Sequence, residues 1–192
     1  AYIKGNSMFE DWQKVIVSAD KDFIQLLDDK TILHRPIQKE YLNKNNIVEN
    51  FGIHPVNFAL ARAIVGDSSD NLRGVPRVGM NTIAKRFPFL GEEKVYYLSD
   101  ILEECRKPDN KQKVFSSIEE SEELIVSNYD IMQLSSPMLS IQAKQGIDNT
   151  FEQYKPHYNQ TEIRKLMLQD GVLTVSTADL EQRFNSIITS FL

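Results

Sequence analysis

Residues 64–79 read Ile64-Val65-Gly66-Asp67-Ser68-Ser69-Asp70-Asn71-Leu72-Arg73-Gly74-Val75-Pro76-Arg77-Val78-Gly79. A pair of aspartates precedes a Gly-x-x-x-x-Gly segment with two nearby arginines, and a helical pattern follows. A second pair, Asp20 and Asp22, follows the apolar run at residues 15–18. Clustered carboxylates favour a hard divalent cation, and a glycine-bounded turn at a helix start favours a phosphate backbone. Together these features predict a nuclease.

The bulk composition narrows the class of protein. The chain has 192 residues and a formal net charge of −5, which argues against binding nucleic acid over its whole surface. Its one cysteine, Cys105, cannot form an internal disulfide, which fits a reducing cytosol. No apolar run approaches the roughly 18 residues that a membrane span needs. The chain opens on Ala1 in a helical pattern, so we expect its natural N-terminus to lie upstream.

Hydrophobic periodicity predicts few strands and many helices. Two short apolar runs, 15–18 and 31–35, are typical of buried strands. The helical spacing of residues 23–27 places Asp20 and Asp22 at a strand-to-helix junction, where sites gather in open α/β folds. Residues 135–150, with Pro137 and Gly146, are expected to be irregular. Helices are predicted at residues 46–51, 55–66, 80–87, 92–106, 118–134, 161–169 and from Ser176 to Leu192.

This order of elements predicts the end of an α/β domain followed by an all-helical C-terminal region. Two strands do not make a stable sheet alone, so an N-terminal half of the domain is expected upstream. We divide the chain into residues 1–53, the end of the α/β domain, residues 54–90, the hairpin element, and residues 91–192, the helical region.

The four aspartates suit a divalent-metal site. Asp20 and Asp22 are two positions apart, and Asp67 and Asp70 are three apart, so each pair can converge on one point. Carboxylate and water oxygens are the ligands that Mg²⁺ and Mn²⁺ prefer. In phosphodiester hydrolysis, two metals roughly 3.5–4 Å apart clamp the attacking and leaving oxygens. The alternatives are that Asp20 only caps a helix and that residues 67–71 form a solvated turn.

The glycine-bounded hairpin, residues 72–79, has the features of a phosphate-binding element. Gly74 and Gly79 allow a positive φ and a close backbone approach, so successive N–H groups can face a phosphate. The charged residues between positions 71 and 90 are all basic: Arg73, Arg77, Lys85 and Arg86. This local charge of +4 favours contact with a nucleic-acid backbone without sequence readout. The alternative is a plain connecting turn before a surface helix.

Two blocks of sequence resemble the 5′ nuclease family, which includes flap endonucleases, phage 5′–3′ exonucleases and the 5′ nuclease domain of bacterial DNA polymerase I. The first block is Val17-Ser18-Ala19-Asp20-Lys21-Asp22-Phe23-Ile24-Gln25-Leu26-Leu27. The second is Gly66-Asp67-Ser68-Ser69-Asp70-Asn71-Leu72-Arg73-Gly74-Val75. The resemblance covers about residues 1–90 and corresponds to the C-terminal portion of the family's nuclease domain. It implies a PIN-like parallel-sheet domain followed by a helix–hairpin–helix (helix–three-turn–helix) element.

The resemblance also implies residue roles. Asp20, Asp22, Asp67 and Asp70 match the catalytic ligands of the family's second metal position, served by Mg²⁺ or Mn²⁺. The backbone carbonyls around Val75 and Val78 match a K⁺ site in the hairpin. The residues implied to contact DNA are Arg73, Gly74, Val75, Arg77, Gly79, Thr82, Lys85 and Arg86. The chain departs from many relatives at Arg77, where they have a third glycine, and at Asn81, where they often have a lysine.

The implied activity is two-metal, structure-specific hydrolysis at 5′ ends or flaps of DNA or RNA primers during replication. The first-metal carboxylates, the catalytic lysine or arginine and the arch over the 5′ end match positions upstream of Ala1. The implied partners are duplex or flapped DNA, RNA–DNA hybrid and, through the C-terminal helices, replication proteins. We expect a monomer in the cytoplasm of a bacterial or phage-infected cell.

Two alternatives come from other classes. A non-catalytic helix–hairpin–helix DNA-binding module would use the hairpin alone, but it has no need for four crowded carboxylates that repel phosphate. A PIN-like ribonuclease acting on structured RNA would share the metal chemistry, but such enzymes typically lack the hairpin that follows Asp70 here.

Overall fold

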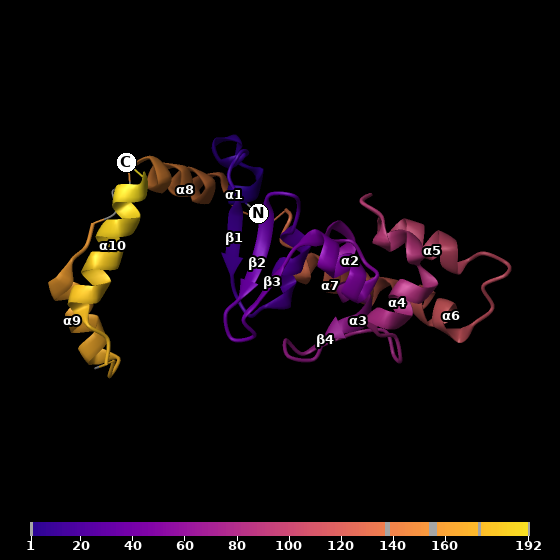
Figure 1. Ribbon diagram of the computed structural model, residues 1–192. Helices are drawn as coiled ribbons and strands as arrows, with labels where there is room; N and C mark the ends of the chain where they lie inside the picture. Colours follow the sequence, from indigo (N-terminus) through magenta and orange to yellow (C-terminus); the bar gives the residue numbers. More distant parts are fainter. Residues whose placement is uncertain (1, 137–138, 154–156, 173, 192) are drawn as a thin grey trace. The chain divides into compact units, whose positions relative to one another are not determined.

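The computed structural model describes residues 2–136, 139–153, 157–172 and 174–191. The chain forms two compact units, Ala1–Met138 and Leu139–Leu192 (Figure 1). The first unit contains a small sheet and the helices around it, and it carries every aspartate and hairpin residue singled out above. The three-part functional division of the chain stays a prediction.

The sheet of the first unit has the order β1-β2-β3. Strands β1 (Lys14–Val17) and β2 (Thr31–Arg35) pair in parallel, with Val17 opposite His34. Both strands were predicted from their apolar runs. The antiparallel β3 (Glu40–Leu42) was missed, because three residues after a tight turn offer too short a pattern to detect. Its Leu42 lies opposite Leu33, and both side chains are buried.

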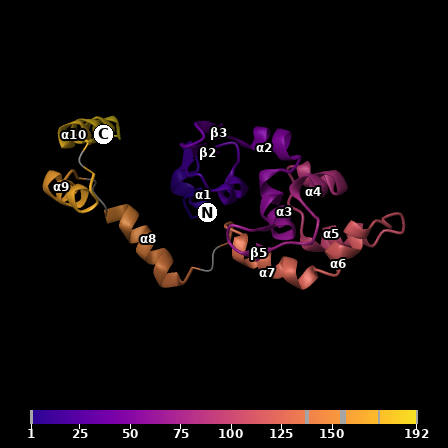
Figure 2. The same cartoon turned by 90° about the horizontal axis from the view of Figure 1, so that it is seen from below.

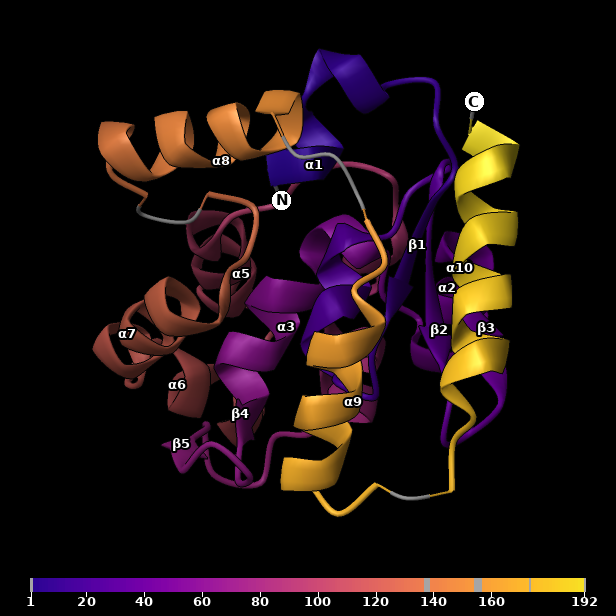
Figure 3. The same ribbon diagram turned by 90° about the vertical axis from the view of Figure 1, so that its left-hand side faces the viewer.

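The helix α3 (Phe58–Val65) forms the centre of the first unit. Figure 3 shows it between the sheet on one side and α6 (Lys113–Glu119) and α7 (Glu122–Met132) on the other. Six of its eight residues are buried, so it packs on nearly every side. The exceptions are Val65 and a single charged residue, Arg62. The helix therefore positions Arg62 and the segment that follows Val65 within a rigid core.

The remaining helices of the first unit surround this centre (Figure 2). Asn43 and Asn46 form a capping box that begins α2. The segment after Asp20 was predicted as helical, and it is a short 3₁₀ helix, η2. The bounds of these surrounding α and 3₁₀ helices are α1 (Tyr2–Gly5), η1 (Ser7–Phe9), η2 (Lys21–Leu26), α2 (Lys44–Phe51), η3 (Pro55–Asn57), α4 (Met80–Arg86), η4 (Pro88–Gly91) and α5 (Leu98–Cys105).

Two predicted helices differ from the structure for local reasons. The helix predicted at 92–106 begins only at Leu98, because the Asn57 amide bonds to the backbone of residues 92–96 and holds it in an irregular path. The helix predicted at 118–134 corresponds to the end of α6, which begins earlier at Lys113, and to the separate helix α7. At their junction the Ser121 hydroxyl donates to the Ser117 carbonyl at 2.7 Å, a local bond that competes with helix continuation.

The second unit contains α8 (Ile141–Gln153), α9 (Gln160–Gln169) and α10 (Thr177–Phe191). The Tyr158 hydroxyl donates to the Thr177 carbonyl at 2.6 Å, and its ring packs on Phe184. The prediction of an irregular stretch at 135–150 was wrong from Ile141 onward, because Gly146 is tolerated inside α8 at a cost of about 1 kcal/mol. Pro137 lies outside the described residues. Within the described residues, no helix is long and apolar enough to cross a membrane.

Candidate metal centre and nucleic-acid interface

The first carboxylate pair follows the end of β1. The chain leaves the strand at Val17, and Asp20 then begins η2 by accepting the Asp22 N–H at 2.8 Å. Asp20 is therefore a helix cap, as the alternative interpretation predicted. This capping bond holds Asp20 and Asp22 in one tight turn at the carboxyl end of a strand. Asp20 is exposed, whereas Asp22 is partly buried.

The second pair lies in a β-hairpin formed by β4 (Gly66–Asp67) and β5 (Leu72–Arg73). Asp67 accepts the N–H of Ser69 at 2.8 Å and its hydroxyl at 2.5 Å, which closes the loop. The paired strands differ from the hairpin predicted at residues 72–79. The aspartates belong to the antiparallel hairpin itself, and residues 74–79 form a separate turn that leads into α4.

The two pairs meet in space. One carboxylate oxygen from each of Asp22, Asp67 and Asp70 lies within 4.8 Å of the others, although 45 or more positions separate Asp22 from the other two. A cavity of about 520 Å³ lies at this site. Asp20 is outside the group of three, but it lines this cavity together with Asp67 and Asp70. An oxygen-only donor set of this kind fits a hard divalent cation such as Mg²⁺ or Mn²⁺. It does not fit a soft metal.

Arg62 is a residue of this site that the motifs did not reveal. Its guanidinium donates to Asp67, to Asp22 at 3.4 Å and to the Gly66 carbonyl at 3.4 Å. Its Nε is buried without a hydrogen-bond partner. One signal could have found it, because Arg62 is the only charged residue in the apolar helix α3. Arg62 therefore supplies the positive charge that partly balances the carboxylates.

The carboxylates differ in their titration. Burial raises the pKa of Asp22, the Arg62 charge opposes this, and the nearby carboxylates of Asp20 and Asp67 raise it further. The hydrogen bond from the Ser69 hydroxyl lowers the pKa of Asp67. Ionising Asp22 therefore has a cost in the folded chain, and a bound cation would remove that cost.

We expect Asp22→Asn to stabilise the folded chain at neutral pH in the presence of a chelator. Asp22 binds its proton more tightly in the folded state than in the unfolded one, so its contribution to stability falls as pH rises from about 3.8 through the raised pKa. Asparagine has nearly the same shape and cannot ionise. The urea midpoint at pH 7 should rise, and the difference from the parent chain should shrink near pH 3. A lower midpoint at pH 7 would contradict the argument.

The turn that follows the hairpin corrects one detail of the predicted glycine roles. Position 74 has no room for a side chain, because a Cβ there would meet the Val65 carbonyl oxygen at 1.9 Å. Position 79 does have room for a side chain, because Gly79 has φ −118° and nothing lies within 4 Å of an added Cβ. Neither has a positive φ; the left-handed residue of this turn is Arg77, with φ 66°. The side chains of Val75 and Val78 are buried and anchor the turn to the core.

The predicted basic residues are available for a ligand. Arg73, Arg77, Lys85 and Arg86 are all exposed, and none of them forms an ion pair within the part of the chain that the structure describes. Thr82 is half-buried, and its N–H donates to Gly79 in the first turn of α4. Their roles in DNA contact, and the K⁺ site around Val75 and Val78, stay predictions.

We expect Arg77→Gly to separate binding from folding. The left-handed backbone costs a non-glycine residue about 1 kcal/mol, and the extra unfolded-state freedom of glycine offsets a similar amount, so stability should change little. If Arg77 contacts a phosphate, the salt slope of duplex binding should fall by about 1. Fluorescence anisotropy over a salt series measures this slope, with Arg77→Lys as the charge-preserving control. An unchanged slope would place Arg77 outside the contact.

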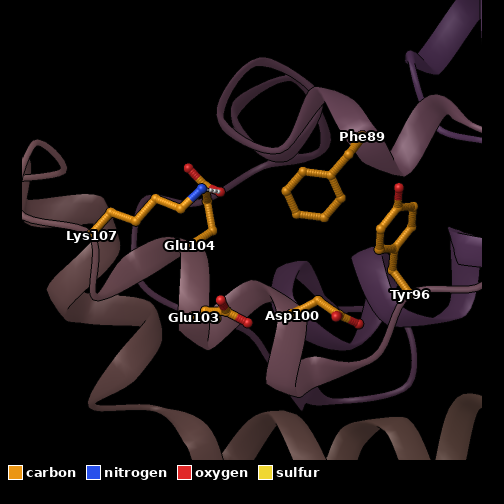
Figure 4. A pocket seen from close by; sticks show the side chains of 6 residues that line it. All are labelled: Phe89, Tyr96, Asp100, Glu103, Glu104 and Lys107. Atoms are coloured by element: carbon orange, nitrogen blue, oxygen red, sulfur yellow. Dashed lines mark hydrogen bonds and ion pairs between the residues drawn. The ribbon is translucent and has the colours of Figure 1, made fainter.

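A second cavity, of about 280 Å³, lies between η4 and α5 (Figure 4). Phe89 and Tyr96 line one side, with ring centroids 4.7 Å apart. Two of its three acidic residues have partners in the structure, because Glu104 pairs with Lys107 at 2.6 Å and Asp100 accepts the Tyr97 N–H, and the third is Glu103. Among the described residues, the group of three carboxylates that could hold one cation is Asp22, Asp67 and Asp70, and none of these lines this cavity.

Known proteins match both the sequence and the fold. The 5′-3′ exonuclease of Buchnera aphidicola is 43% identical over 70 residues, which are 36% of this chain and 24% of that protein. The 5′-3′ exonuclease of Mycoplasmopsis pulmonis is 28% identical over 180 residues, 87% of this chain and 59% of that protein. The zinc-bound T5 5′-exonuclease superposes with a TM-score of 0.54 at 25% identity, over 68% of this chain and 46% of that one. No protein-family model matches.

The relatives that these matches name are nucleases and DNA polymerases, and one of the matched structures is described with bound divalent metal ions. In sequence the chain is similar to 5′-3′ exonucleases and to DNA polymerase I, and in fold it is similar to T5 5′-exonuclease, which supports the resemblance to the 5′ nuclease family. The matched regions span between 12% and 59% of the length of four of the curated relatives.

Proposed function

We propose that this chain contributes the second-metal half of a 5′ nuclease site together with its DNA-holding turn. The observation that carries the proposal is the convergence of Asp22, Asp67 and Asp70 within 4.8 Å, from segments far apart in sequence. Either pair alone is explained by capping or by turn formation. Their convergence beside an exposed basic turn has no such local explanation.

The roles of the residues follow from their placement. Asp20, Asp22, Asp67 and Asp70 would hold Mg²⁺ or Mn²⁺, which supplies charge stabilisation to the oxygens of a phosphodiester under attack. Arg62 keeps the carboxylates of Asp22 and Asp67 together before a cation arrives. The basic residues Arg73, Arg77, Lys85 and Arg86 hold the duplex by its phosphates, so specificity rests on DNA structure and not on base sequence.

The complete activity is proposed from the relatives. Residues 54–90 act as a helix–hairpin–helix element, with K⁺ held by carbonyls near Val75 and Val78. The intact enzyme uses two metals to hydrolyse phosphodiesters at 5′ ends or flaps of DNA or RNA primers, and its first-metal ligands are supplied from outside residues 1–192. It acts on duplex or flapped DNA and RNA–DNA hybrids as a monomer in the cytoplasm of a bacterial or phage-infected cell. The C-terminal helices contact replication proteins.

The test combines binding and cleavage on one substrate, a fluorescent 5′-flap duplex. The chain should bind it with a steep salt dependence, as backbone contacts require, and should cleave it weakly or not at all. The full reading frame that contains this chain should cleave the flap only when Mg²⁺ or Mn²⁺ is present. Binding without any cleavage by the full reading frame would overturn the nuclease proposal and leave the non-catalytic DNA-binding module.

A further inference from the structure

The helix α7 is hydrogen-bonded to the frame of the second carboxylate pair. The Asn128 side chain is buried, with 3% exposed, and its amide nitrogen donates to the Ala63 carbonyl at 2.9 Å and to the Arg73 carbonyl at 2.8 Å. Ala63 lies in α3, just before the Asp67–Asp70 hairpin, and Arg73 ends it. The Asn128 side chain of α7 therefore bonds both to the segment that enters the aspartate loop and to the segment that leaves it.

The same helix is hydrogen-bonded to the first carboxylate pair. The Gln25 side chain donates to the Met132 carbonyl at 2.9 Å and accepts the Leu134 N–H at 2.8 Å. Gln25 lies in η2, three positions after Asp22, and Met132 is the last residue of α7. Over 100 positions separate Gln25 from these partners, so this contact is a feature of the tertiary structure alone.

The two contact points lie on one rigid segment. Asn128 and Met132 are four residues apart in α7, which places them about 6 Å apart along the helix axis. That distance cannot change without breaking helical hydrogen bonds. We propose that α7 is a brace that sets the separation of the two carboxylate-bearing segments, with Asn128 and Gln25 as positioning residues for the metal centre. This inference rests on the proposed function.

The strict coordination geometry of the metal ion explains why the separation of the two segments matters. Mg²⁺ tolerates little departure from octahedral oxygen geometry, and the carboxylates of Asp22, Asp67 and Asp70 repel one another. Side chains that orient metal ligands typically change metal affinity 10–100-fold when they are removed. In this chain, Asn128 bonds to the backbone around the Asp67–Asp70 loop, and Gln25 joins the segment that carries Asp22 to the backbone at the end of α7, so neither bond acts on a carboxylate itself.

The test measures Mn²⁺ affinity by calorimetry for Asn128→Leu, Gln25→Met and the double variant. Each single variant should bind Mn²⁺ about 10-fold more weakly. The double variant should bind Mn²⁺ no more weakly than the weaker-binding single variant. The reason is that removing either side chain's hydrogen bonds to its partner already releases one carboxylate-bearing segment from the other. Full additivity of the two losses would show two independent contacts and would overturn the brace.

Asn57→Leu is the matched control. Asn57 is also a fully buried amide, and it donates to the Leu90 and Lys94 carbonyls, but it lies at the opposite end of α3 from the aspartate hairpin. It should lower the urea midpoint as Asn128→Leu does while leaving Mn²⁺ affinity unchanged. An equal loss of Mn²⁺ affinity in Asn57→Leu would reduce Asn128 to a general stability role and overturn the proposal.

The remaining outcomes separate the brace from the proposed function. If Asn128→Leu does not fold, the test of the brace rests on Gln25→Met, since the Gln25 side chain is only half-buried. An unchanged Mn²⁺ affinity in that variant overturns the brace. If the unsubstituted chain shows Mn²⁺ binding that Asp67→Asn abolishes and both brace variants bind equally well, only the brace fails. If the unsubstituted chain binds no Mn²⁺, the proposed function fails and the brace with it.

Discussion

The double substitution Asp67→Asn/Asp70→Asn should weaken Mn²⁺ binding by more than the roughly 10–100-fold that the loss of a ligand-orienting residue typically costs. It removes two of the three carboxylates that converge within 4.8 Å and leaves Asp22 as the remaining anionic ligand of that group. The loop should keep its shape, because an asparagine oxygen at position 67 can still accept the Ser69 N–H. Calorimetric titration with Mn²⁺ measures the loss directly. In the full reading frame, flap cleavage should fall by a similar factor or more.

The control for this substitution changes charge equally elsewhere. Asp148→Asn/Glu152→Gln removes two exposed carboxylates from α8, which has no part in the candidate centre. It should leave both Mn²⁺ affinity and cleavage unaltered. If the two double variants behaved alike, the effect would be one of net charge, and the converging aspartates would not form a metal centre.

The second large effect is expected from Gly74→Ala, which should destabilise the first unit by about 3 kcal/mol. An added Cβ would meet the Val65 carbonyl oxygen at 1.9 Å and the Gly66 nitrogen at 2.7 Å, and both belong to the backbone. Neither can move without opening the β4–β5 hairpin that holds Asp67 and Asp70. Urea unfolding should show the loss, and duplex binding should fall with it.

Gly79→Ala is the matched control, since it adds the same methyl group at the other end of the turn. Gly79 has an ordinary backbone conformation and nothing within 4 Å of an added Cβ. Its stability should change by less than about 1 kcal/mol, the size of the glycine-to-alanine entropy effect. A severe loss in Gly79→Ala, or none in Gly74→Ala, would contradict the close-approach argument.

Local chemistry explains which features could be predicted from the chain. The strands at 15–18 and 31–35 have β-branched apolar runs, and the aspartate pairs lie beside them or beside a glycine-ended helix. Such patterns act over a few residues, so periodicity and spacing reveal them. The resemblance to a known family rests on the same short blocks. Short or interrupted elements escaped, as β3 and the break between α6 and α7 show.

Residue types and local spacing were enough to predict the candidate ligands, the basic turn and a metal-dependent reaction on a phosphate backbone. The folded structure was needed to learn that Asp22 lies close to Asp67 and Asp70 and that Arg62 bonds to Asp22 and Asp67. It was also needed to find that Asn128 and Gln25 connect both segments to α7. The physical reason is that the contacts that bring these segments together join residues 40 to 109 positions apart. Such contacts form only when the core around α3 packs, and no local pattern encodes them.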